Sequence, residues 1–129
     1  MKALGASLLL IALLSVARPA GADSIYKGTL AADQPFTLNL DNAGISSGKT
    51  TVAVIYYLTL GRPATKFEVF IVAAGARESF LQVIPRGTRL IAIELAPPNN
   101  TTVNVEAAQG SSSFTQACVR GCTLTFDLQ

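Results

Sequence analysis

The sequence contains no histidine and no tryptophan, a single methionine and only two cysteines among its 129 residues. Histidine is the commonest general base and a frequent metal ligand, so its absence excludes hydrolases of the Ser-His type and most zinc enzymes. Charged residues make up 14% of the chain and hydrophobic residues 50%, whereas disordered proteins are rich in charge and poor in apolar residues. We therefore expect a chain that folds around one apolar core, and we predict no catalytic residue, no metal and no cofactor.

Residues 1–22 have the layout of an export signal. The basic Lys2 precedes an uncharged segment at residues 3–17, and small residues follow the break at Pro19. The uncharged segment is shorter than the roughly 20 residues needed to cross a bilayer, which favours a cleaved signal peptide over a retained anchor. We expect a mature domain of residues 23–129, secreted or periplasmic, with no membrane span after cleavage.

Cleavage would also change the charge balance. It would remove Lys2 and Arg18, leaving eight basic residues against eight acidic ones and a formally neutral domain. The remaining charges are scattered singly along the chain. Nucleic-acid binding is not expected, because it requires a basic patch and aromatic residues interleaved with it.

Apolar and polar residues alternate with a period of two through most of residues 23–129, which predicts β-strands. The segment 49–60 is apolar on both faces, as is typical of a central strand that is covered on both sides. No window of helical periodicity is present in this part of the chain. Nine short strands are expected, at residues 25–30, 36–40, 49–60, 66–73, 79–84, 88–95, 101–107, 114–118 and 122–128.

Short strands separated by turn signals about every ten residues indicate a β-sandwich or a barrel. We predict an all-β fold, a single small sandwich of about eight or nine mainly antiparallel strands with Greek-key or jelly-roll-like connections. Pro85-Arg86-Gly87 is expected to form a hairpin turn, and residues 61–64 another turn. The strand order stays open, although the missing tryptophan and the close spacing of the cysteines argue against a true immunoglobulin domain.

The cysteine pair is the most specific local signal. Cys118 and Cys122 are separated by three residues that end in glycine, which in an exported protein predicts a disulfide across a local hairpin. A redox or metal site is the alternative, but a lone pair without histidine does not favour it. The clamped turn would expose Val119 and Arg120. We select these two residues, together with Arg86, as a candidate recognition loop.

Two further patterns carry weaker signals. Asn39, Asp41 and Asn42 gather oxygen donors near the end of a strand, but their spacing matches no calcium-binding loop and such residues favour turns. Asn99 and Asn100 both begin glycosylation motifs on an expected turn, and these matter only if the host glycosylates exported proteins.

Three classes of function remain. The sequence favours a secreted or periplasmic, non-catalytic binding module with a protein or glycan partner. The alternative is a structural or self-assembling surface protein, because the apolar segments 50–61 and 67–75 would template strand pairing if they were exposed. A small secreted hydrolase or an enzyme inhibitor is the second alternative. Exposed edge strands would favour self-association, and a cleft lined by carboxylates would favour the hydrolase.

Overall fold

The structure is a computed structural model that describes residues 24–58, 63 and 66–129. The expected export signal and most of the expected turn at 61–64 lie outside these residues. All nine predicted strands are confirmed, with small shifts at their ends, and the described residues contain no helix. The strands are β1 Ser24–Leu30, β2 Phe36–Asp41, β3 Lys49–Tyr57, β4 Lys66–Ala73, β5 Arg77–Gln82, β6 Leu90–Ala96, β7 Thr102–Gln109, β8 Ser112–Val119 and β9 Cys122–Leu128.

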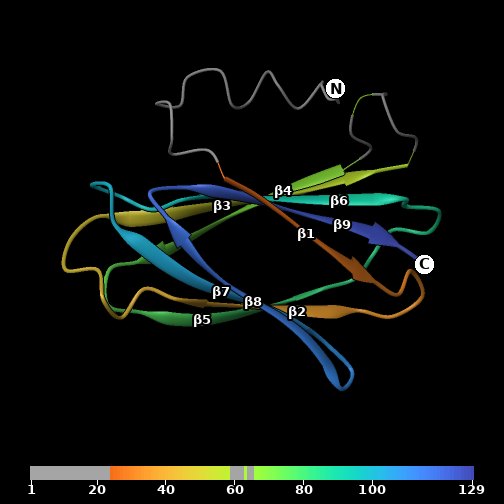
Figure 1. The fold of residues 1–129 in the computed structure, drawn as a ribbon, viewed down its shortest axis with the longest axis horizontal. Helices are drawn as coiled ribbons and strands as arrows, with labels where there is room; N and C mark the ends of the chain where they lie inside the picture. The colour runs from red at the N-terminus through yellow and green to blue at the C-terminus, as the bar shows by residue number, and fades with distance from the viewer. Residues whose placement is uncertain (1–23, 59–62, 64–65) are drawn as a thin grey trace.

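The strands form two sheets that face each other, which confirms the predicted sandwich (Figure 1). The five-stranded sheet has the order β1-β9-β6-β3-β4, and the four-stranded sheet has the order β5-β2-β7-β8. Neighbouring strands are antiparallel except β1 and β9, which run parallel. The long β7–β8 hairpin extends past one end of the sandwich (Figure 1).

Two connections predicted as hairpins are arches between the sheets. The turn at 85–87 joins β5 to β6, and the disulfide-linked turn joins β8 to β9, but the two strands of each pair lie in different sheets. Gly87 (86°) and Gly121 (118°) have positive φ angles, as the turn glycines suggested, and Arg120 has one as well (59°). A hairpin within one sheet and an arch between two sheets can use the same turn residues, so the local sequence does not distinguish them.

The core lies between the sheets and is built from alternate residues of each strand, as the period of two requires. In β3, for example, Val52, Val54 and Tyr56 point inward and are fully buried. Two aromatic pairs close the sides of the sandwich, one of which joins β4 to β5. Phe70 and Phe80 stack there with ring centroids 4.3 Å apart.

The second aromatic pair closes the opposite side of the sandwich. Phe114 of β8 and Phe126 of β9 meet edge to face with their ring centroids at 5.3 Å. Gly28 of β1 faces these rings, and a Cβ atom at this position would lie 2.9 Å from the ring of Phe126. Glycine therefore allows β1 to lie close against the pair.

A second, smaller apolar cluster lies on the outer face of the five-stranded sheet. It contains the buried residues Ile55, Tyr57 and Ala92, with Ala53 and Leu90 packed against them. The predicted central position of β3 is confirmed, since β3 pairs with β4 on one side and β6 on the other. Its apolar residues on both faces thus belong to two separate clusters.

Candidate functional site

The structure does not bring the predicted recognition residues together. Val119 is 47% exposed and Arg120 is exposed at the β8–β9 arch, next to the pairing of Cys122 with the end of β6. Arg86 is also exposed, but it precedes the start of β6 and therefore lies at the other end of the sandwich. The three side chains cannot form one recognition loop.

The predicted disulfide between Cys118 and Cys122 is present, and both residues are fully buried. It joins the edge strand of one sheet to an inner strand of the other at the β8–β9 arch. The backbone N–H of Arg120 also donates to the Thr101 carbonyl at 2.9 Å, which ties the arch to the start of β7. The cysteine pair therefore has a structural position at the junction of the two sheets.

The polar residues considered for calcium point in different directions. Asn42 is fully buried, and its amide nitrogen donates to the carbonyls of Val72 at 2.8 Å and Ala73 at 3.2 Å. Asp41 instead accepts from the backbone of Ala43. Among the described residues, no three histidine, cysteine or acidic side chains gather in a way that could hold a metal ion.

A shallow polar groove of about 410 Å³ crosses the outer face of the four-stranded sheet. The Ser79 hydroxyl donates to Asn39 at 2.5 Å, and the Asn39 amide donates to Glu106 at 2.8 Å. Arg77 forms an ion pair with Asp41 at 3.3 Å. These polar side chains bind one another, as is common on the solvated face of an antiparallel sheet.

The charge of Asp41 is fixed by its immediate neighbours in this groove. The backbone N–H of Ala43, followed by the guanidinium of Arg77, lowers the pKa of the Asp41 carboxyl below its ordinary value. Both contacts favour the ionised carboxylate. Asp41 is therefore a charged partner of Arg77 at neutral pH.

The β4 strand is the most unusual surface of the described structure. It lies at the edge of the five-stranded sheet, and its outward side chains Phe67, Val69 and Ile71 are 66%, 51% and 56% exposed. Lys66 and Glu68 form an ion pair at 3.1 Å at the beginning of the strand, and the remainder up to Ala73 is uncharged. We use the name β4 edge for residues 66–73 with these three outward side chains.

Each of the other three edge strands carries polar or charged residues beside any exposed apolar side chain, such as Ile25 in β1 and Leu81 in β5. β1 has Lys27 on its outer face, β5 begins with Arg77 and Glu78, and β8 consists mainly of serine, threonine and other small or polar residues. Charges and polar groups on an edge strand discourage pairing with another chain. The β4 edge has this protection only at its first residues.

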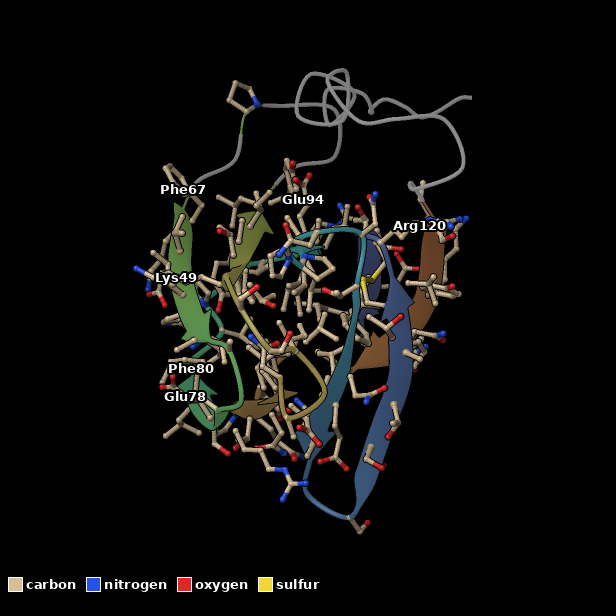
Figure 2. All side chains as sticks on the ribbon, turned by 90° about the vertical axis from the view of Figure 1, so that its left-hand side faces the viewer. Lys49, Phe67, Glu78, Phe80, Glu94 and Arg120 are labelled. Carbon is tan, nitrogen blue, oxygen red and sulfur yellow. A yellow bond between two sulfur atoms is a disulfide. The ribbon has the colours of Figure 1, made fainter. Side chains whose placement is uncertain are left out.

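The β4 edge is continuous with the small apolar cluster on the outer face of the sheet. Phe67 pairs in register with Ile55, and Val69 pairs with Ala53. Figure 2 shows Phe67 at one end of β4, on the side of the molecule away from Arg120. Within the cluster, burial raises the pKa of Tyr57 to about 12, with a smaller contribution from the negative charge of Glu94.

Sequence reasoning identified this segment but not its position. The sequence predicts that the run 67–75 would template strand pairing if it were exposed, but its apolar residues on both faces also suit a central strand. The edge position depends on the strand order, which no local pattern encodes. The exposed face of β4 is the surface feature that the sequence left undecided.

Comparisons with protein-family models, with curated proteins and with solved structures found no match to this chain. The described residues also include no helix long and apolar enough to cross a membrane. The site is therefore interpreted from its own geometry.

Proposed function

We propose that this chain is an exported, non-catalytic interaction protein that binds an extended segment of another polypeptide along the β4 edge. The observation that carries this proposal is the row of exposed apolar side chains on an edge strand with little charge. Large apolar side chains in a row are uncommon on the surface of a soluble monomer and mark interaction sites. The buried disulfide is compatible with an extracellular location, and the layout of residues 1–22 supports export.

Strand addition is the mode of binding that suits this edge. β4 pairs with β3 on one side, and no other described strand pairs with its second side. An edge strand presents backbone N–H and C=O groups that an extended peptide can bind, while alternate side chains supply specificity. Phe67, Val69 and Ile71 would then contact every second side chain of the bound segment.

The geometry favours the β4 edge, rather than the loops, as the binding surface. The loop residues favoured by the sequence present one apolar and two cationic side chains at two ends of the molecule. The β4 edge presents three large apolar side chains in one row. A partner with an extended, apolar-alternating segment fits the second surface better.

The test is binding of fluorescent eight-residue peptides of alternating valine and threonine, followed by anisotropy and by backbone hydrogen exchange. We expect binding to slow amide exchange in residues 66–73 but not in the edge strands β1 and β8. Val69→Lys should weaken binding, whereas Leu81→Lys on the edge strand β5 should not. Leu81 is a matched control because it is also exposed and apolar. Binding that protects a different edge, or none, would contradict the proposal.

A further inference from the structure

We infer that the partner of the β4 edge is a second copy of this chain, whose β4 pairs antiparallel with the first across a twofold axis. This inference rests on the proposed function, and it names the occupant of that same edge. The closed dimer would join two five-stranded sheets through their β4 strands. Only one edge of each sheet is used, so the assembly ends at two copies.

The β4 edge is complementary to itself. In an antiparallel pair related by a twofold axis, residues that face each other must lie on the same side of the sheet. When the pair is centred on Val69, Phe67 of each copy lies opposite Ile71 of the other copy, and the two Val69 residues lie opposite each other. Aromatic and β-branched side chains in directly opposite positions stabilise antiparallel pairs. The outward contacts among Phe67, Val69 and Ile71 of the two copies are therefore apolar.

The charged residues of β4 also permit this pairing. Lys66 and Glu68 are already paired with each other within the strand at 3.1 Å. In the pairing centred on Val69, Glu68 faces Phe70 of the second copy and Lys66 faces Val72, so no two like charges lie directly opposite. A second copy thus brings no charge repulsion to the edge.

The outward apolar row of β4 continues onto the neighbouring strand β3. Phe67 and Val69 lie beside Ile55 and Ala53 of β3, so the outward apolar row is already two strands wide in one copy. Pairing through β4 would extend it across four adjacent strands, two from each copy. Polar edge strands such as β8 would not produce a comparable row.

The experiment combines sedimentation of the disulfide-bonded protein over a range of concentrations with single-cysteine cross-linking. The native cysteines are paired, so Val69→Cys would supply the single free thiol of the chain. Directly opposite residues have Cα atoms about 4.5–5.5 Å apart, within the range of about 4.4–6.8 Å that a disulfide needs. We expect Val69→Cys to form a covalent dimer on mild oxidation, and Leu81→Cys to stay mainly monomeric.

A charge variant supplies the second measurement. Val69→Lys would place two ammonium groups opposite each other, and we expect it to raise the dissociation constant of the dimer tenfold or more, while Leu81→Lys leaves it unchanged. Val69 is half exposed, so the circular dichroism spectrum should show that the variant still folds. A protein that stays monomeric at all concentrations, or a dimer that resists Val69→Lys, would overturn the inference. If such a monomer still bound the valine–threonine peptides at β4, the proposed function would stand and only the identity of the partner would be wrong.

Discussion

The buried hydrogen bonds of Asn42 at the β2–β3 connection give a direct test of what stabilises this part of the fold. Its fully buried side chain donates to two carbonyls of β4 and accepts a hydrogen bond of 2.8 Å from the hydroxyl of Thr50, which is also fully buried. The side chain therefore links the end of β2 to β3 and β4. Asn42→Ala would remove all three hydrogen bonds, of which those to Val72 and Thr50 are buried.

The magnitude follows from the groups left behind. The Val72 carbonyl and the Thr50 hydroxyl would lose buried hydrogen bonds, and each loss costs about 1–3 kcal/mol. We expect Asn42→Ala to lower the free energy of unfolding by about 3 kcal/mol, out of roughly 5–15 kcal/mol for a small domain. For a domain of this size, this corresponds to a fall in Tm of roughly 10–20 °C.

Urea unfolding and calorimetry measure this change, and two variants make it specific. Asn39→Ala is the control, because its hydrogen bonds lie on the solvated face and water can replace them, so its loss should stay below about 1 kcal/mol. The double variant Asn42→Ala/Thr50→Val should lose less than the sum of its single changes, since no hydroxyl would then be left without a partner. A loss below about 1 kcal/mol for Asn42→Ala would refute the reasoning.

Two further predictions concern the disulfide and the core tyrosine. Replacing both Cys118 and Cys122 by alanine should lower the free energy of unfolding by about 2 kcal/mol, because the bond closes a very short loop. Unfolding should stay cooperative, since β8 and β9 keep their strand partners. Complete loss of folding, measured by circular dichroism, would show that the bond holds the whole fold. Burial, and then the negative charge of Glu68, raises the pKa of Tyr56, whose hydroxyl donates to Gln82 at 2.8 Å. The unfolded chain would lose the tyrosine proton first, so this contribution to stability is complete below about pH 10 and is lost as the pH rises above it. Stability measured between pH 9 and 11 should therefore fall less steeply in Tyr56→Phe than in the native protein, and equal slopes would contradict the assignment.

The sequence predicted the strands well because each strand buries one face. Alternation in segments such as 122–128 follows directly from the two sides of a sheet, and turn residues mark where each segment ends. The disulfide was predictable for a similar local reason. With a sequence separation of only four, the two sulfur atoms can meet independently of how the rest of the chain folds.

The arrangement of the strands was not predictable in the same way. Arg86 and Arg120 lie in turns with similar residue patterns. Both turns cross between the sheets, but one lies at each end of the sandwich. The exposure of Val69 follows from the edge position of β4 among the described strands, which is a property of the whole topology. Asn42 carried a polar signal that suggested a ligand, whereas its contacts are with backbone carbonyls from a distant part of the chain.

The parallel pairing of β1 with β9 has a consequence for the order in which the molecule can assemble. Ser24 pairs with Cys122 and Leu30 with Leu128, so β1 cannot pair in the sheet until β9 has been synthesised. Because β9 also separates β1 from β6, the five-stranded sheet cannot be completed until residues 122–128 have been synthesised. A chain that stopped before residue 122 would leave β1 without its neighbour and would turn β6 into an open edge.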